Sequence, residues 1–299
     1  MRFGGCHRVM IVVRIMGGLG NQMFQYAFGA YLASRHNTEL WLDRSALESD
    51  PLRDFMLDRW QVTGREAPQS VREMIPRKRR WYQAWSRPGR RLRRVAEKPF
   101  GFRRRYLETP DDSFLDGYWQ SEQFLPGMKR RLGAEFQPAG PLSAMTQAVA
   151  EKMTGGESVS LHVRRTDYLS LSYANPCPLD YYEQSVAEVL AKHAGVQLFV
   201  FSDDIPWCRQ QFDFPCPVMF VDHNDATTAH EDMWLMSRCR HHIIANSTFS
   251  WWGAWLGVDE TGEVYAPQNW FADPTMDSTA IVPETWRRIP RQSQGREAA

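Results

Sequence analysis

Two adjacent arginines close an apolar run in the segment HVRRTDY, residues 162–168. The run predicts a strand over 158–165, which places Arg164 and Arg165 at the carboxyl end of a strand, the usual ligand edge of a parallel sheet. Neighbouring strand side chains point to opposite faces, so one arginine can face a ligand while the other pairs with a carboxylate, of which Asp167 is nearest. A guanidinium suits a diphosphate, because it stays charged and makes two parallel hydrogen bonds. A surface Arg–Asp pair explains the same residues when they are considered alone.

Two acids stand at the end of another predicted strand, VQLFVFSDD, residues 196–204. The carboxylate of Asp203 or Asp204 can accept from N1–H and N2–H₂ of a guanine, a donor pair that adenine lacks. The same pair suits a divalent cation. Either aspartate also suits the N-cap of a helix that begins at Ile205-Pro206. Capping by one acid and ligand contact by the other are compatible.

Small polar side chains open a predicted helix in NSTFSWWGAWL, residues 246–256. Asn246 or Ser247 can cap this helix. The free backbone N–H groups and the helix dipole favour an anion at such a terminus, so this is a second feature suited to phosphate. The tryptophans of this helix, at 251, 252 and 255, are expected in the core.

A glycine turn lies between an apolar run and a long helical pattern in MGGLGNQMFQYAFGAYLA, residues 16–33. Gly18 and Gly20 fit the first two glycines of the dinucleotide fingerprint, but Met23 occupies the third position. Asp43, about 20 residues beyond the turn, keeps a dinucleotide-binding oxidoreductase as an alternative. That alternative gives no role to the arginine, aspartate and serine motifs above.

Other motifs of known chemistry are absent from the sequence. His241-His242 opens a short apolar strand and, with His162, lacks the spacing of zinc ligands; no Cys-x-x-Cys pair completes such a site. Neither a G-x-S-x-G nor a G-K-[ST] segment occurs. We therefore expect no bound metal.

The elements that position these motifs alternate between strands and helices, which predicts α/β architecture with parallel sheets. A linker at QPAGPLS, 137–143, separates two such halves, so we expect two facing α/β domains with a ligand cleft between them. The domains are expected at 10–140 and 141–285, with a tail at 286–299. The predicted strands are 10–15, 39–43, 158–165, 196–204, 218–224 and 241–245, and the predicted helices are 21–35, 126–133, 178–193, 230–239 and one from 246.

The chain has 299 residues and a net charge of +1, which conceals one strongly basic stretch. Between Arg77 and Arg105 there are thirteen Lys or Arg and a single acid, Glu97, so the local charge is +12. Aromatic residues alternate with these cations, which favours contact with an anionic membrane surface. A nucleic-acid binder and a merely solvated surface are the alternatives.

The cysteines and the apolar runs indicate in which cellular compartment the protein is expected. Five cysteines, an odd number without a Cys-x-x-Cys pair, favour reduced thiols in a cytoplasmic protein. No apolar stretch approaches the roughly 20 residues of a membrane span, and the N-terminus lacks a convincing signal peptide. The first strand opens at Met10, which makes Met10 an alternative start to Met1.

Taken together, GGLGNQMFQYA, HVRRTDY, FSDD followed by a tryptophan, and NSTFSWWGAWL resemble, in this order, the α-1,2-fucosyltransferases of glycosyltransferase family 11. GYWQSEQF, residues 117–124, resembles the bacterial members, and the likeness covers roughly residues 10–270. The resemblance implies a GT-B-like fold of two Rossmann-type domains and inverting transfer from GDP-β-L-fucose, with no cofactor or obligatory metal. A transferase of the same architecture that uses another GDP-sugar or forms another linkage, such as α-1,6-fucosyl, is the alternative. The resemblance also implies a glycan acceptor, expected to be a β-galactoside in a lipid-linked repeat, and no nucleic acid.

The same resemblance implies roles for individual residues. Arg164 or Arg165 would bind the diphosphate, and Asn21 would approach it from the turn formed by Gly17, Gly18 and Gly20. His162 and an acid of FSDD would contact guanine, while Ser247 and Thr248 would support the phosphates. The remaining motif residues expected at the donor site are Gln22, Asp167, Asn246, Phe249 and Ser250. No motif names a general base; Asp43 and Glu122 are candidates, because they fall at predicted strand or loop ends of the acceptor half.

Overall fold

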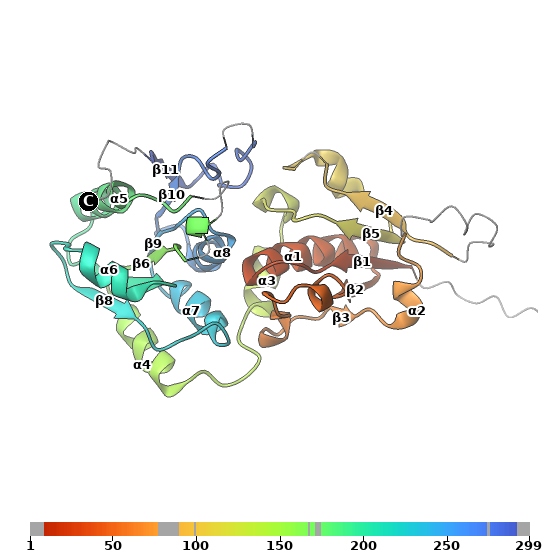
Figure 1. Cartoon of the computed structure of the whole chain (residues 1–299), viewed down its shortest axis with the longest axis horizontal. Coiled ribbons are helices and arrows are strands. Elements are labelled where there is room, and N and C mark those ends of the chain that lie inside the picture. The colour runs from red at the N-terminus through yellow and green to blue at the C-terminus, as the bar shows by residue number, and fades with distance from the viewer. Residues whose placement is uncertain are drawn as a thin grey trace, which may run out of the picture. The chain divides into compact units, whose positions relative to one another are not determined.

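The structure is a computed structural model that describes residues 9–76, 90–98, 100–166, 168–170, 175–273 and 276–291. The chain divides into two compact units, Met1–Phe136 (unit 1) and Gln137–Ala299 (unit 2). The division falls at the start of the proline- and glycine-containing segment 137–143. Each unit is built on one parallel β-sheet, which Figure 1 shows with its helices.

Unit 1 holds a five-stranded sheet in the order β3-β2-β1-β5-β4, and all four strand pairs are parallel. The strands predicted at 10–15 and 39–43 and the helix predicted at 21–35 are confirmed as β1, β2 and α1. The strands are β1 Met10–Arg14, β2 Glu39–Asp43, β3 Arg65–Glu66, β4 Arg93–Ala96 and β5 Ser113–Asp116. The helices are α1 Leu19–His36, α2 Gln69–Arg72 and α3 Lys129–Glu135, with short 3-10 turns η1 Leu47–Ser49, η2 Leu57–Arg59, η4 Arg104–Glu108 and η5 Glu122–Phe124.

The two faces of the unit 1 sheet are covered by different elements. Helix α1 lies close against one face: a Cβ added to Gly29 would be 2.8 Å from Leu40 Cδ1 and 3.3 Å from Val13 Cγ1. Because side chains alternate along a strand, the other residues of β1 face the opposite side. There they join an apolar cluster of Met10, Val12, Ala67, Val71, Ile75, Leu92 and Phe114.

Unit 2 holds a six-stranded parallel sheet in the order β11-β10-β9-β6-β7-β8. The strands are β6 Ser158–Val163, β7 Gln197–Ser202, β8 Val218–Val221, β9 His241–Ile243, β10 Val264–Pro267 and β11 Arg287–Ile289. The helices are α4 Ala144–Met153, α5 Leu179–Lys192, α6 Ile205–Gln211, α7 Ala229–Met236 and α8 Thr248–Gly257, with a 3-10 turn η6 Tyr168–Ser170. The expected tail from residue 286 is corrected, since β11 pairs there with β10.

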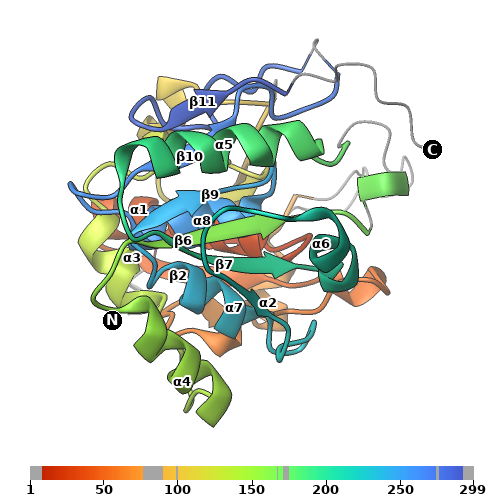
Figure 2. The same cartoon turned by 90° about the vertical axis from the view of Figure 1, so that its left-hand side faces the viewer.

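The unit 2 sheet is covered on both faces. One apolar cluster joins β6 residues such as Leu161 to Tyr182 and Val186 of α5. The other joins Phe199 and Phe201 of β7 to side chains of α4 and α7. Figure 2 shows α5 on one side of the sheet and α4 and α7 on the other. The tryptophans at 251, 252 and 255 are buried, which confirms the expectation that they pack in the core.

The sequence analysis predicted reduced thiols and no membrane span, and the described part of the chain bears on both predictions. Cys177, Cys208, Cys216 and Cys239 are free thiols, whereas Cys6 lies outside the described residues. None of the described helices is long and apolar enough to cross a bilayer.

Candidate functional site

The HVRR and FSDD motifs lie side by side in unit 2 and bind each other. Strands β6 and β7 are parallel neighbours with Val163 opposite Ser202, so the residues that follow them meet at one edge of the sheet. The Asp203 carboxylate accepts from the backbone N–H of Arg165 at 2.9 Å and from the N–H and hydroxyl of Thr166 at 3.2 and 2.6 Å. Asp203 therefore holds the loop that begins after β6.

The two arginines of the motif are held in different ways. Arg165 donates from Nε to Asp204 Oδ2 at 3.3 Å, and its guanidinium lies 3.8 Å from the Trp207 ring centroid. Arg164 has Nη1 at 3.3 Å from Asp203 Oδ2 and lies near Tyr168, at 5.8 Å from the ring centroid. The described carboxylates that pair with the arginines are thus those of FSDD. Asp167, the partner predicted from sequence proximity, lies outside the described residues.

Asp204, rather than Asp203, is the residue that caps the helix after FSDD; the sequence left both as candidates. Asp204 is the N-cap of α6, and its Oδ1 accepts from the backbone N–H of Trp207 at 3.2 Å. The same carboxylate holds Arg165, as described above, so the cap and the arginine–tryptophan stack form one unit. Trp207 was not predicted as a site residue, although it follows the FSDD motif closely in the sequence.

His162 lies at the end of β6 with 5% of its surface exposed. Burial, reinforced by the positive charge of Arg164 and opposed by Asp203, lowers the pKa of His162 to about 3, so the ring is neutral at neutral pH. Its centroid is 5.5 Å from that of Phe249. Among the described residues Nδ1 has no hydrogen-bond partner, and a buried polar atom of this kind retains capacity to bind a ligand.

The NST motif follows β9, which is the other neighbour of β6. Ser247 is the N-cap of α8, and its Oγ accepts from the Phe249 N–H at 3.3 Å. The Asn246 amide instead donates to the carbonyls of Asn175 and Trp270 at 3.2 and 3.0 Å. Asn246 therefore ties loops together, which leaves the helix start at Ser247 and Thr248 as the part of the motif suited to an anion.

Ser250 and Tyr168 complete this edge of the sheet. The Ser250 hydroxyl donates back to the carbonyls of Ala245 and Ser247 within the same turn. The Tyr168 hydroxyl donates to the Asn246 carbonyl at 3.1 Å, which links the loop after β6 to the loop after β9. The carboxyl ends of β7, β6 and β9 thus bring the three motifs together in unit 2.

The glycine turn of unit 1 is shaped around Asn21. Gly17 has φ +74°, and a Cβ added there would lie 2.8 Å from Asn21 Nδ2, so glycine meets both a backbone and a space requirement. Gly18 is the N-cap of α1, and Gly20 is buried within its first turn. Gln22 is also buried, and its amide donates to the carbonyls of Gly17 and Asp54 at 2.9 and 2.7 Å. Gln22 thereby fastens the turn to a neighbouring loop.

A second turn in unit 1 presents a partner to Asn21. Gln120 donates from Nε2 to Asn21 Oδ1 at 2.8 Å. The preceding residue, Trp119, is buried with φ +58°, a conformation that bulky residues rarely adopt. The Glu97 carboxylate accepts from the N–H groups of Tyr118 and Trp119 at 2.7 and 2.9 Å, and burial raises the pKa of Glu97. Neither Glu97 nor Gln120 was predicted as a site residue, although Gln120 lies within GYWQSEQF and Glu97 is the single acid of the basic stretch.

The two candidate bases occupy different settings in unit 1. Asp43 is the last residue of β2, is 1% exposed, and accepts from the Ser45 N–H and hydroxyl at 3.3 and 3.1 Å. Glu122 begins η5 in a half-buried position next to the N-cap Ser121. The assignment of either carboxylate as a base stays a prediction.

The basic stretch 77–105 is described only in part, since 77–89 and 99 lie outside the described residues. Arg90 pairs with Asp112 and Arg94 with Asp116, so part of the stretch neutralises acids of unit 1. Arg91 and Arg93 are exposed. A test of membrane binding should therefore substitute these two.

A histidine and acid cluster lies at the opposite, amino edge of the unit 2 sheet. Glu157, His193 and His241 bring ligand atoms within 4.8 Å of one another, the spacing of a metal site. However, His241 Nδ1 accepts from the Glu263 N–H at 3.1 Å, which leaves Nε2 protonated to donate to Glu157 at 2.8 Å. A protonated nitrogen has no lone pair for a metal. The cluster therefore fits a structural network better than a metal site.

Comparison with known proteins places this geometry in a class. The fold resembles the crystal structure of NodZ α-1,6-fucosyltransferase soaked with GDP-fucose, with a TM-score of 0.53 and 17% identity over 83% of this chain and 92% of that one. Two parallel-sheet units of this kind define a GT-B-like fold.

The family follows from the sequence comparisons. The profile of "Glycosyl transferase family 11" matches residues 101–290. An alpha-1,2-colitosyltransferase of Escherichia coli is 33% identical over 94% of this chain and 99% of its own length. The O-antigen biosynthesis glycosyltransferase WbnK of Escherichia coli is 30% identical over 88% of this chain and 97% of its own length. The chain belongs to glycosyltransferase family 11 and is a glycosyltransferase.

Proposed function

We propose that the protein transfers L-fucose from GDP-β-L-fucose to a hydroxyl of a glycan acceptor, forming an α-1,2 linkage with inversion. The observation that carries the proposal is the convergence of HVRR, FSDD and NST at the carboxyl ends of three adjacent strands in unit 2. Arginine, a neutral histidine and a helix N-terminus on one sheet edge suit a nucleoside diphosphate.

In the proposed reaction the acceptor hydroxyl attacks C1 of fucose, the C1–O bond to GDP breaks, and the hydroxyl proton passes to a general base or to water. Negative charge then grows on the leaving diphosphate. Arg164 and the N–H groups at the start of α8 would offset this charge, so the reaction needs no metal ion. Asn21 of the glycine turn stays a predicted donor-site residue. Asp203 acts indirectly, because it holds the loop that carries both arginines.

A second donor is supported by the similarity to the colitosyltransferase. Colitose is fucose without its 3-hydroxyl, so the two donors differ by one polar group. A site that hydrogen-bonds this hydroxyl would reject the deoxy sugar by several orders of magnitude, whereas an apolar site discriminates weakly. GDP-colitose is therefore the alternative donor.

The proposed function is tested by GDP release from purified protein given GDP-fucose, GDP-colitose or GDP-mannose, with lactose as the acceptor and EDTA present. We expect turnover with GDP-fucose that survives chelation, and a product whose linkage is α-1,2 by NMR. Turnover with GDP-colitose alone would replace the donor. Activity lost on chelation and restored by Mn²⁺ would overturn the metal-free mechanism.

We also propose that the protein acts at the cytoplasmic face of a membrane, where lipid-linked repeats are assembled, through exposed cations of the basic stretch. Each such cation contributes about 1 kcal/mol near an anionic surface. Vesicles containing phosphatidylglycerol should retain the protein at low salt, and Arg91→Gln with Arg93→Gln should weaken retention. Equal sedimentation with neutral vesicles would contradict this proposal.

A further inference from the structure

A row of charged side chains crosses the carboxyl end of the unit 1 sheet. The strands β2, β1, β5 and β4 are consecutive neighbours, and each supplies one member: Asp43, Arg14, Asp116 and Arg94. Arg14 and Asp43 are paired in register, and Arg94 lies beside Phe114, two residues before Asp116. The charges therefore alternate in sign across four strands.

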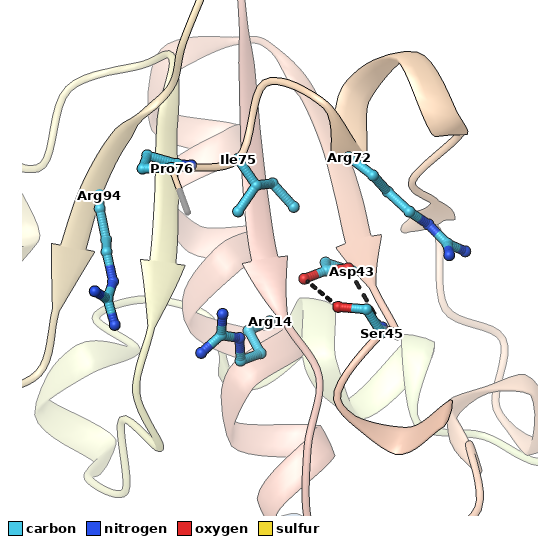
Figure 3. A pocket seen from close by; sticks show the side chains of 7 residues that line it. All are labelled: Arg14, Asp43, Ser45, Arg72, Ile75, Pro76 and Arg94. Atoms are coloured by element: carbon cyan, nitrogen blue, oxygen red, sulfur yellow. Dashed lines mark hydrogen bonds between the residues drawn. The ribbon is translucent and has the colours of Figure 1, made fainter. Parts of the chain in front are cut away.

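The row lies on the face that carries the apolar cluster around Val12 and Phe114. Arg14 shares a face of β1 with Val12, and Asp116 shares a face of β5 with Phe114, because side chains alternate. Apolar packing closes the first half of this face. At the carboxyl end it gives way to a pocket of 270 Å³, drawn in Figure 3, that is lined by Arg14, Asp43, Ser45, Arg72, Ile75, Pro76 and Arg94.

The arginines of the pocket are held in place by acids. Asp116 accepts from Arg14 Nη1 at 2.7 Å and from Arg94 Nε at 2.8 Å, and Figure 3 shows the Arg94 side chain running toward that of Arg14. Arg72 donates to Glu48 and Glu66 at 2.8 and 2.7 Å. Because Asp116 is shared, Arg14 and Arg94 keep N–H groups without a protein acceptor in the described part of the chain.

Among the residues that the structure describes, the charges around the pocket cancel, and this balance indicates the class of ligand. The three lining arginines are matched by Asp43, Asp116, Glu48 and Glu66, and the excess acid is offset by Arg44, which also binds Glu66. An anion would gain little from a neutral surrounding and would meet the carboxylate of Asp43. A sugar hydroxyl both donates and accepts, so alternating carboxylates and guanidiniums suit an uncharged polyol.

The pocket also differs from what stability alone would favour. Partly buried ion pairs are often no more stabilising than apolar side chains of the same size, and the adjoining cluster already supplies apolar packing.

The volume of the pocket equals that of about nine water molecules, which suits a single sugar ring rather than a longer ligand. From Arg14 the chain runs through Ile15 and Met16 into the Gly17 turn, so the pocket and the turn share one sheet edge.

We propose that this pocket binds one uncharged pyranose ring of the acceptor glycan, with Asp43 and Ser45 on one side and Arg14 and Arg94 on the other. The identification of this sugar as the acceptor rests on the proposed function. Binding of a sugar in the pocket can be tested without measuring turnover. Asp43 and Arg94 are then residues that determine acceptor specificity.

Saturation-transfer NMR on the intact protein with methyl β-D-galactopyranoside would test the pocket directly. Asp43→Asn and Arg94→Gln should each weaken binding, and raise KM for lactose, by about tenfold, the effect of losing a hydrogen bond to a charged group. The Kd for GDP should not change. The matched control is Arg59→Gln, which removes an exposed arginine of unit 1 that does not line the pocket.

The outcomes separate this inference from the proposed function. Unchanged galactoside binding in both variants would overturn the pocket, and so would tighter binding of methyl β-D-galacturonide, which would indicate an anion site. Failure of the wild-type protein to bind GDP would overturn the proposed function. The galactoside experiment would still test whether the pocket binds a sugar. If Asp43→Asn does not fold, Arg94→Gln decides, because the Arg94 side chain is 44% exposed.

Discussion

The carboxyl edges of the two sheets carry their polar residues in different ways. In unit 2 the residues lie in short contiguous motifs that bind one another, as Asp203 binds both Arg165 and Thr166. In unit 1 the charged residues come singly from separate strands, as Arg14 and Asp116 do, and meet only when the sheet forms. Contiguous motifs suit a fixed chemical group such as a diphosphate. Dispersed residues allow one unit to change its ligand by single substitutions.

The unit 2 edge is tested most severely by Arg164. Arg164→Lys should reduce kcat nearly as much as Arg164→Ala, by about 10²–10³-fold, because an ammonium ion cannot replace a bidentate fork on the leaving diphosphate. Arg165→Lys is the matched control, since Arg165 stacks on Trp207 and should affect stability more than kcat. Steady-state kinetics with GDP-fucose would measure both. Near-normal kcat in Arg164→Lys would transfer the role to Arg165.

The unit 1 edge is tested at its glycine turn. Gly17→Ala should reduce kcat by up to about 10²-fold, because the new Cβ would displace Asn21, and small misplacements of reacting groups have effects of this size. Gly127→Ala is a close control: Gly127 has the same φ of +74°, but its Cβ would meet nothing within 4 Å. Equal losses in both variants would assign the effect to backbone strain rather than to Asn21.

His162 makes the stability of unit 2 depend on pH. Its pKa of about 3 in the folded protein lies below the ordinary value of 6.5, so between these values the unfolded chain binds a proton that the folded chain does not. Stability is therefore complete above pH 6.5 and falls on acidification by about 1.4 kcal/mol per pH unit, or about 2 kcal/mol by pH 5. Urea unfolding of His162→Gln should show a flatter dependence. An unchanged slope would contradict the assignment.

A smaller effect is expected from the contact that supports Asn21. Gln120→Ala removes the 2.8 Å hydrogen bond to Asn21 and should reduce kcat by about tenfold without changing KM for lactose. Gln123→Ala, at an exposed position of the same segment, is the control. A change confined to thermal stability would make Gln120 a structural residue.

The sequence predicted β1, β2, β6, β7, β8 and β9, and the described strands that it missed include internal ones as well as edges: β5 and β10 lie inside their sheets, whereas the predicted β8 is an edge strand. β6 and β7 are central and read as apolar runs, and both were predicted. β4 and β11 end their sheets and consist of RRVA and RRI, which carry no hydrophobic pattern. A tail was expected from residue 286 because β11 carries no such pattern.

The residues of the candidate site were also predicted only where the local sequence carries a pattern. Arg164, Asp203 and Ser247 were found because each stands at the end of an apolar run within a recognisable motif. Glu97 was not found, since its partners lie about twenty residues away on another turn. Contacts of this kind depend on how loops pack, and no local pattern specifies them.

The close approach of Gly117 and Glu97 has a consequence for how this family diverges. A Cβ at position 117 would lie 2.5 Å from the Glu97 Cβ, and the Glu97 carboxylate holds the backbone of the very turn that Gly117 begins. Because any residue other than glycine at position 97 keeps that Cβ, replacing the acid would not make room for a side chain at 117. Lineages that abandon the glycine should therefore show a different backbone path for this turn.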